Sequence, residues 1–304
     1  MMQKLKWLTA GESHGKGLLG ILEGIPAGLE VEEEYIAAHL ARRQKGHGRG
    51  GRMKIEEDQA EIYCGIRHGK TLGSPIGLIL PNRDWDNWKT KLSVEPVVEE
   101  IKKVTLPRPG HADLAGAQKF DFDDIRNVLE RSSARETAMR VALASVCRKL
   151  LDKVDIEVGS RVIQIHKVKD SSPIPEDTSP SQLNAIADES PVRCLHKKTE
   201  KEMIAAIDKA KQKGDSVGGI FEIIATGLPY GLGSYTHWDR KLHTRLTSTM
   251  MSINGLKGIE IGAGFDGAGR LGSETHDEIG WDGDHYIRYS NNVGGLEGGM
   301  SNSQ

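Results

Sequence analysis

The sequence predicts one large domain of the α/β or α+β class. Segments with the apolar spacing of helices alternate with strand-like segments along all 304 residues, and this alternation is typical of mixed folds. Signals for tight hairpins are scarce, and no internal repeat or linker-like stretch divides the chain. A chain of this length can hold one large or two ordinary domains. The lack of a linker favours a single domain.

The first third of the chain is predicted to contain three strands, one long helix and, at its end, one short helix. Apolar residues cluster from Leu18 to Ile25 and stop at Pro26, as expected of a strand. The acidic run at Glu32 begins a helix that ends before Gly46, because acid-first and base-last order suits the helix dipole and glycine is a common C-terminal cap. The other predicted elements here are strands 60–66 and 75–80 and a loop over 82–106 with a short helix at 97–104.

The longest helix is predicted from Asp123 to Lys153. Its apolar stripe consists of Ile125, Leu129, Ala138, Ala142 and Val146. Arg131 and Arg135 lie four residues apart and would share one face of this helix. Ser132 and Ser133 have poor helix propensity, so packing or ligand contact is expected to explain them.

Strands and helices continue to alternate in the second half of the chain. The predicted elements are strands 156–165, 217–226 and 259–265, an exposed loop over 170–180, a helix over 200–213 and a helix that follows Asp239. Thr199 and Asp239 are the expected N-terminal caps of the two helices. The tail from Gly272 is glycine-rich and polar.

The overall charge and the cysteines exclude several classes of protein. The 41 basic and 43 acidic residues give a net charge of −2, so no general attraction to nucleic acid or membranes is expected. Three widely spaced cysteines without a Cys-x-x-Cys pair predict a reducing compartment, no disulfide framework and no metal site. No apolar run approaches the roughly 20 residues of a membrane helix, and no targeting segment is recognised at the start. We therefore predict a cytoplasmic protein.

Two glycine-flanked histidines are the candidate catalytic residues. His14 lies in Gly-Glu-Ser-His-Gly and His111 in Arg-Pro-Gly-His-Ala-Asp. Each has a polar neighbour that could orient its ring, Ser13 in the first motif and Asp113 in the second. Histidine can both give and take protons near neutral pH. His47, which lies between glycines in the basic loop, could instead contact phosphate. Structural roles are assigned by default to His39, His68, His166, His196, His243, His276 and His285.

Two arginine clusters accompany these histidines, one over residues 42–52 and one at Arg131 and Arg135. Arginine forks bind phosphate and carboxylate groups bidentately, so the clusters predict an anionic small-molecule ligand. Two other interpretations fit the same residues: Arg42 and Arg43 also suit the C-terminal end of a helix, and residues 42–54 could contact RNA. The near-neutral charge and the lack of interleaved aromatic residues argue against RNA.

Nine short motifs together resemble the chorismate synthase family. They are Gly11–Gly15, Gly48–Met53, Lys70–Pro75, Arg108–Asp113, Arg131–Thr137, Gly231–Ser234, Lys257–Gly262, His276–Glu278 and Ser290–Asn292. The motifs occur in the order of the family and span nearly the whole chain. Accidental similarity of several independent motifs in one order is very improbable.

The resemblance implies a fold, an activity and an assembly. The fold is α+β, a layered sandwich of antiparallel sheets packed with helix layers, in a single domain over residues 1–304. The activity is a phosphate-eliminating carbon–oxygen lyase, which converts 5-enolpyruvylshikimate 3-phosphate to chorismate by 1,4-anti elimination in aromatic amino acid biosynthesis. Reduced FMN is required without net redox change, and the assembly is a cytoplasmic homotetramer.

The resemblance also implies roles for individual residues. His14 would donate a proton to the leaving phosphate, and His111 would lie by the flavin and stabilise its reduced form. The residues implied in substrate binding are Ser13, Arg43, Arg49, Arg52, Arg108 and Arg135. Those implied in FMN binding are Arg131, Ser132, Ser133, Asn254, Gly255 and Gly298.

The sequence departs from the family pattern at its C-terminal end. Family members continue for several dozen residues past the turn at Gly298, and that segment carries a Lys-Pro pair, an arginine and an aspartate implied as a base. No residue here is assigned to those roles. The sequence is then either a fragment or a truncated protein, and the alternative function is a truncated homologue that binds flavin or an anion without catalysis. Some members also carry an NADPH-dependent flavin reductase activity; no added reductase domain is recognised here, so NADPH is expected only if that activity is present.

Overall fold

The computed structural model describes residues 5–50 and 56–304. The chain forms two compact units. The first unit comprises Met1–Val154, Val162–Ser172 and Asp188–Ile220, and the second comprises Asp155–Arg161, Pro173–Ala187 and Phe221–Gln304. The organisation as a single domain stays a prediction.

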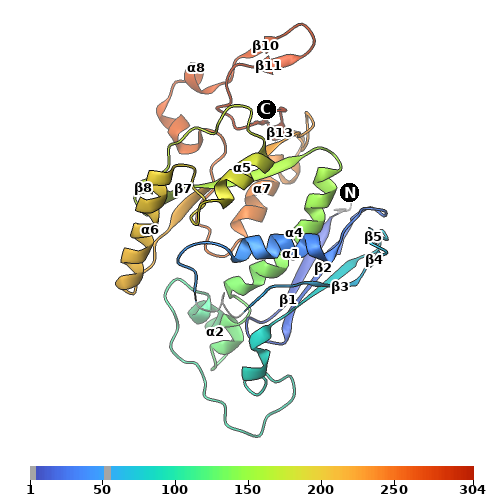
Figure 1. Ribbon diagram of the computed structural model, residues 1–304, viewed down its shortest axis with the longest axis vertical. Helices are drawn as coiled ribbons and strands as arrows, with labels where there is room; N and C mark the ends of the chain where they lie inside the picture. The colour runs from blue at the N-terminus through green and yellow to red at the C-terminus, as the bar shows by residue number, and fades with distance from the viewer. Residues whose placement is uncertain (1–4, 51–55) are drawn as a thin grey trace. The chain divides into compact units, whose positions relative to one another are not determined.

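The first unit is built on a four-stranded antiparallel sheet (Figure 1). Its strands, in spatial order, are β1 (Lys6–Gly11), β2 (Gly17–Glu23), β6 (Ile76–Pro81) and β3 (Glu61–Cys64). Side chains alternate between the two faces of a strand, and in β2 this places Leu18 and Leu22 inside while Leu19 and Ile21 are half exposed. One face of the sheet is therefore covered.

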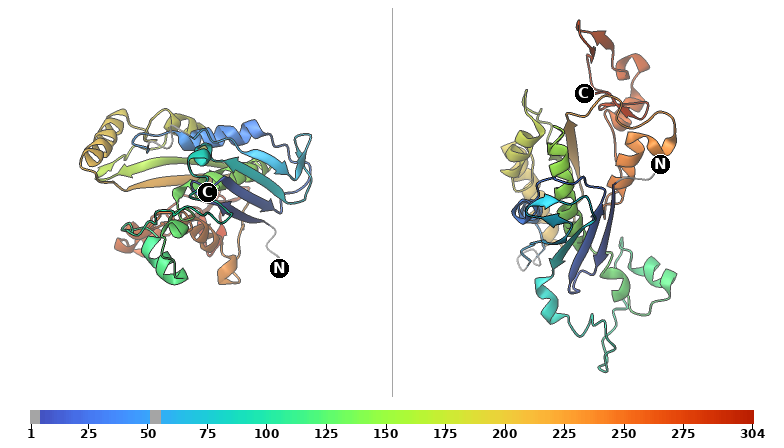
Figure 2. Two further views of the ribbon diagram at one scale, coloured as in Figure 1. Left: turned by 90° about the horizontal axis from the view of Figure 1, so that it is seen from below. Right: turned by 90° about the vertical axis from the view of Figure 1, so that its right-hand side faces the viewer.

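Two helices cover that face. They are α1 (Glu33–Gln44) and α4 (Thr137–Asp152), which lie side by side (Figure 1; Figure 2, left). The core between them and the sheet includes Leu18, Leu22, Ile36, Leu40, Ile76, Leu78, Leu80, Ala138, Met139, Ala142, Leu143 and Val146. The predicted strands over 18–25 and 75–80 and the helix that ends before Gly46 are confirmed, because their apolar periods match this burial.

Hairpins are more common than predicted. β1, for which no strand was predicted, pairs with β2 across a tight connection. β4 (Ile66–Arg67) and β5 (Lys70–Thr71) are joined by His68 and Gly69, both with positive φ, at 52° and 72°. Two consecutive positive φ angles are the geometry of a two-residue hairpin turn, for which Asn-Gly is the usual sequence signal. His-Gly was missed for that reason.

The long helix predicted over Asp123–Lys153 is wrong. The structure divides it into α3 (Arg126–Leu129), the 3₁₀ turn η3 (Ala134–Glu136) and α4. Ser133 has an extended ψ of 144° and its side chain accepts a hydrogen bond from the Arg135 backbone N–H. Serine competes with helix hydrogen bonds in this way, so Arg131 and Arg135 do not share a helix face.

The first unit also contains a second, smaller core, which lies beside α6. α6 (Lys197–Gln212) contributes Met203, which is buried with Val192 and Cys194. This helix begins before the predicted Glu200, because the side chain of His196 caps it by accepting the Thr199 N–H. Other elements of the chain are η2 (Arg83–Asn87), α2 (Asp113–Phe120), α5 (Pro180–Asp188) and a sheet of order β8-β7-β9, with β7 (Glu157–Ile165), β8 (Val168–Lys169) and β9 (Gly219–Thr226).

The second unit consists mostly of short elements. They are η4 (Trp238–Arg240), α7 (Leu242–Met251), η5 (Gly264–Gly269), α8 (Gly272–Thr275) and the hairpins β10 (Ile279–Trp281) with β11 (Tyr286–Arg288) and β12 (Leu296–Glu297) with β13 (Met300–Ser301). The strand predicted over 259–265 is wrong, since Gly262 and Gly264 have positive φ and interrupt extended backbone.

The short helix predicted at 97–104 is absent; Val97 and Val98 are exposed, so an isolated turn there would have no burial to stabilise it. The α+β class with antiparallel strand pairing is confirmed. Within residues 5–50 and 56–304, no helix is long and apolar enough to span a bilayer.

Candidate active site

The connection between β1 and β2 holds His14 in a tightly fixed turn. The Ser13 backbone N–H donates to the Glu130 carbonyl at 3.0 Å. The side-chain amide of Asn82 donates to the carbonyls of Glu12 and Gly15 at 3.1 and 2.9 Å. The turn is thus anchored from both η2 and the end of α3, so the backbone that carries His14 is well defined.

The imidazole of His14 lies between a carboxylate and an indole. Its Nδ1 atom is 2.9 and 3.0 Å from the two carboxylate oxygens of Glu130. The ring stacks on Trp88 with centroids 4.0 Å apart and planes 24° from parallel. The Glu130 side chain is only 2% exposed, whereas that of His14 is 24% exposed. Among the described residues, Nε2 of His14 has no hydrogen-bond partner, so this nitrogen is available to a ligand.

The second histidine motif has a similar arrangement. His111 precedes α2, and its Nδ1 atom lies 2.5 Å from Oδ1 of the buried Asp113. Arg108 donates to the same carboxylate from Nε at 2.9 Å, and this hydrogen bond holds the pKa of Asp113 well below its usual range. In return, the carboxylate raises the pKa of Arg108, with a smaller contribution from Glu130. Glu130 therefore interacts electrostatically with the second histidine motif as well as contacting the first.

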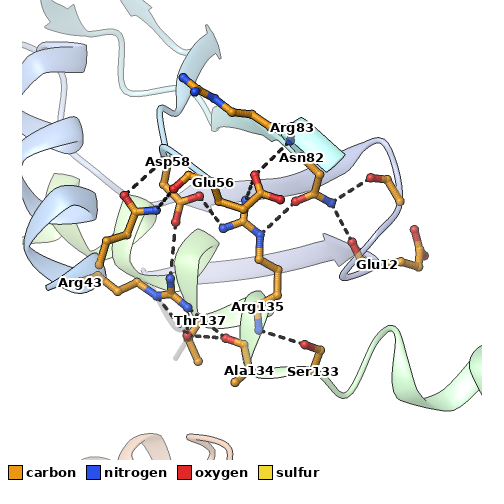
Figure 3. Close-up of polar contacts among 12 residues, drawn as sticks. Glu12, Arg43, Glu56, Asp58, Asn82, Arg83, Ser133, Ala134, Arg135 and Thr137 are labelled. Atoms are coloured by element: carbon orange, nitrogen blue, oxygen red, sulfur yellow. Dashed lines mark hydrogen bonds and ion pairs between the residues drawn. The ribbon is translucent and has the colours of Figure 1, made fainter. Parts of the chain in front are cut away.

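A buried cluster of arginine and acid side chains lies beside the His14 turn (Figure 3). The Arg135 side chain, 6% exposed, pairs with Asp58 through Nη1 and donates to the Asn82 side-chain oxygen at 3.0 Å. Its Nη2 atom is 3.6 Å from a carboxylate oxygen of Glu56. Since Asn82 also binds the turn before and after His14, the position of Arg135 is coupled to that of the histidine.

Arg43 reaches the same cluster from the last turn of α1 (Figure 3). Its Nη1 atom lies 3.4 Å from Asp58, and Nη2 donates to Thr137 Oγ1 at 2.9 Å and to the Ala134 carbonyl at 3.2 Å. Burial lowers the pKa of Arg43. Of the other arginines predicted to bind substrate, Arg49 is exposed and Arg52 lies outside the described residues.

The residues predicted to bind FMN fall in both units. In the first unit, the Arg131 guanidinium donates to the Thr9 carbonyl at 2.8 Å and the Gly11 carbonyl at 3.3 Å, and so stabilises β1. Ser132 donates to the Val128 carbonyl at 2.8 Å. Ser133, also in the first unit, directly precedes η3. The second unit contains the other three, which are Asn254 and Gly255 just after α7 and Gly298 between β12 and β13.

Sequence reasoning missed the residues that position the site. These are Glu56, Asp58, Asn82, Trp88 and Glu130. Glu130 lies 116 positions from His14 along the chain, and no spacing rule connects residues so far apart. A carboxylate directly before the Arg131 motif was the single available signal, and by itself it indicates only a charged residue at the end of a helix.

The fold and the site have the features expected of an enzyme that transfers protons beside an anionic small molecule. A histidine is held by a buried carboxylate, with a ring nitrogen available and arginines nearby. Comparison with known proteins identifies the family. The chorismate synthase family matches over residues 5–304, and the chain belongs to it.

Individual relatives agree with this assignment. Chorismate synthase of Bacillus subtilis (strain 168) is 53% identical over 303 residues, covering 98% of this chain and 77% of that protein. The Aquifex aeolicus (strain VF5) enzyme is 50% identical over 308 residues, covering 99% and 77%. A crystal structure of chorismate synthase is 44% identical, with a TM-score of 0.83 over 100% of this chain and 83% of that one. Membership implies a lyase with a requirement for reduced flavin.

Proposed function

We propose that this protein converts 5-enolpyruvylshikimate 3-phosphate to chorismate and phosphate by 1,4-anti elimination with reduced FMN. The observation that carries the proposal is the His14–Glu130 pair, in which Nε2 has no partner among the described residues. It occurs in a chain of the chorismate synthase family. A substrate with a phosphate and two carboxylates also accounts for the clustered arginines.

The residues proposed to hold the flavin have suitable surroundings, each within its own unit. A Cβ atom built on Gly255 or Gly298 would meet no other atom within 4 Å, and both have positive φ. Such positions let backbone approach a flat ligand closely. The Ser133 hydroxyl accepts the Arg135 N–H and keeps its own proton to donate. When bound, reduced FMN supplies electron density to the breaking carbon–oxygen bond.

The proton transfers are assigned to the two histidines. His14 gives the proton at Nε2 to the oxygen of the departing phosphate, and the electron pair of the broken carbon–oxygen bond leaves with that oxygen. His111, oriented by Asp113 at 2.5 Å, holds a proton beside the flavin. The elimination also removes a proton from the substrate ring, and we assign no described residue to accept it.

The arginines are proposed to bind the substrate anions. The Arg108 side chain is 55% exposed even though Nε pairs with Asp113, so much of its guanidinium remains accessible. Arg49 is exposed as well, and Ser13, Arg43, Arg52 and Arg135 stay in the proposal as further substrate-binding residues. The homotetramer, the cytoplasmic location and the use of NADPH only if a flavin reductase activity is present stay predictions.

Substitution of His14 tests the proposal. With chemically reduced FMN and 5-enolpyruvylshikimate 3-phosphate, we expect the protein to form chorismate in an anaerobic absorbance assay. His14→Ala should lower kcat by roughly 10²–10⁴-fold, the usual contribution of a general acid, while FMN binding measured by fluorescence is retained. His285→Ala, a change at a 70% exposed histidine, is the control and should keep full activity.

Two outcomes of this assay contradict the proposal. Flavin binding by the unsubstituted protein without any product would favour the non-catalytic homologue. Near-normal turnover by His14→Ala would exclude His14 as the proton donor.

A further inference from the structure

The ring of His14 is constrained on its edge and on its face. Glu130 contacts Nδ1 with both carboxylate oxygens, and the same carboxylate accepts the His14 backbone N–H at 2.8 Å. Trp88 covers one face of the ring at 4.0 Å. These contacts leave Nε2 as the one ring nitrogen without a hydrogen-bond partner among the described residues.

We propose that Glu130 is a positioning residue that sets the tautomer and orientation of His14; this inference rests on the proposed function. A carboxylate that is 2% exposed has acceptor oxygens and no proton to give when ionised. Nδ1 of His14 must therefore carry a hydrogen that it donates to Glu130. The second ring nitrogen, Nε2, is then the atom that exchanges protons with a ligand.

The charged groups around the pair are compatible with this arrangement. The guanidinium of Arg126 and the ammonium of Lys91 lie 5.4 and 4.9 Å from the Trp88 ring centroid, and Arg108 interacts electrostatically with Glu130. Glu130 is thus an acid in direct contact with the imidazole, while Lys91 and Arg126 lie by the indole that stacks on it. Its negative charge balances the positive charge of His14 while that ring is doubly protonated.

The proposed movement of protons and electrons balances over the whole elimination: the ring carbon–hydrogen bond breaks, its electron pair enters the new double bond, and its proton passes to water. Doubly protonated His14 donates its Nε2 proton to the phosphate oxygen, and the carbon–oxygen electron pair becomes a lone pair on that oxygen. His14 is left neutral with hydrogen on Nδ1, still bonded to Glu130, and a proton from solvent restores the starting state. Glu130 keeps its charge throughout.

Glu130→Gln is the variant that separates positioning from simple packing. Glutamine has a similar volume but only one acceptor oxygen. It can accept a hydrogen bond from Nδ1 or from the His14 backbone N–H, but not from both. Its NH₂ group then faces the remaining donor. We expect kcat to fall by about 10- to 100-fold, as for other residues that orient a functional histidine. In a His14→Ala background the same change should lower kcat by less than about 2-fold, since groups that act as a unit are not additive.

Nuclear magnetic resonance tests the inference without turnover. In protein labelled with ¹⁵N at histidine, neutral His14 should be the Nδ1–H tautomer, and Glu130→Gln should populate the Nε2–H tautomer. A neutral His14 already in the Nε2–H form would overturn the inference, as would equal losses of kcat in both backgrounds. The tautomer of His14 can be measured even if no chorismate forms. Failure of the proposed function is therefore distinguishable from failure of the inference.

Discussion

Arg135 illustrates how burial defines the role of a single side chain. It was predicted to hold the substrate, and its guanidinium is paired with Asp58 and Glu56, whose side chains are 0% and 2% exposed. Arg108, by contrast, is 55% exposed. Both are arginines and could bind anions. They differ in exposure because Arg135 lies in η3 beside buried acids, whereas Arg108 lies in the loop before α2.

Removal of the Arg135 charge should strongly destabilise the first unit. Arg135→Met removes a positive charge that pairs with the two buried carboxylates. Breaking a buried ion pair in this way lowers the free energy of unfolding by about 3–5 kcal/mol. Arg83→Met is the matched control, because the Arg83–Glu57 pair is half exposed or more on both sides and such pairs contribute about 0–1 kcal/mol. Urea unfolding measures both free energies; similar losses in the two variants would contradict the prediction.

The lowered pKa of Asp113 predicts how the stability of the protein depends on pH. The hydrogen bond from Arg108 depresses the pKa of this carboxyl in the folded protein. A carboxyl whose pKa is lower in the folded than in the unfolded protein stabilises the fold at pH values above its unfolded-state pKa, which is near 4. That stabilisation is lost as the pH falls toward the folded-state pKa. We therefore expect the unfolding free energy to fall more steeply from pH 5 to roughly pH 2–3 in the unsubstituted protein than in Asp113→Asn. Parallel curves for the two proteins would contradict this.

At the level of elements, the break at Ser133 shapes the site. A continuous helix over 123–153 would have carried Arg131 and Arg135 on one face. Instead, the chain turns at Ser133, so Arg131 bonds to β1 while Arg135 enters the acid cluster. The turn also places Glu130 at the end of α3, within reach of the β1–β2 connection.

The close packing of β2 against α4 gives a prediction at this scale. A Cβ atom on Gly20 would lie 2.5 Å from the sulfur of Met139 and 3.0 Å from Leu143, both buried. Gly20→Ala should therefore lower the unfolding free energy by about 1–3 kcal/mol, the usual cost of overpacking. Gly218→Ala is the control, because nothing lies within 4 Å of the added methyl. Equal stability of the two variants in urea would show that the core accommodates the extra volume.

At the scale of the whole molecule, exposed apolar side chains lie on the face of the four-stranded sheet that α1 and α4 do not cover. Leu8, Leu19 and Ile21 are 66%, 50% and 49% exposed, and Leu8 pairs with Ile21 across β1 and β2. Contiguous exposed apolar side chains commonly mark interfaces. The homotetramer expected from the family resemblance would provide further copies of the chain to cover them.

Sedimentation velocity tests that assembly. We expect the unsubstituted protein to sediment as a tetramer and Ile21→Lys to shift toward smaller species, because burial of a lysine charge in an apolar interface is unfavourable. Val154→Lys alters an apolar residue of similar exposure, 54%, outside the sheet, and should leave the tetramer intact. A monomeric unsubstituted protein would refute the prediction.

The sequence by itself determined the family and the α+β class, since these depend on local motifs and on short apolar periods, and it predicted His14 and His111 as the catalytic residues. The strand over Leu18–Ile25 and the helix that ends before Gly46 were predictable because each buries its own periodic face. Only the tertiary structure placed Glu130 and Trp88 on His14, or Asp58 and Glu56 on Arg135. Those contacts join residues far apart in the chain, and their geometry depends on how the β1–β2 connection, η2 and the end of α3 converge in space.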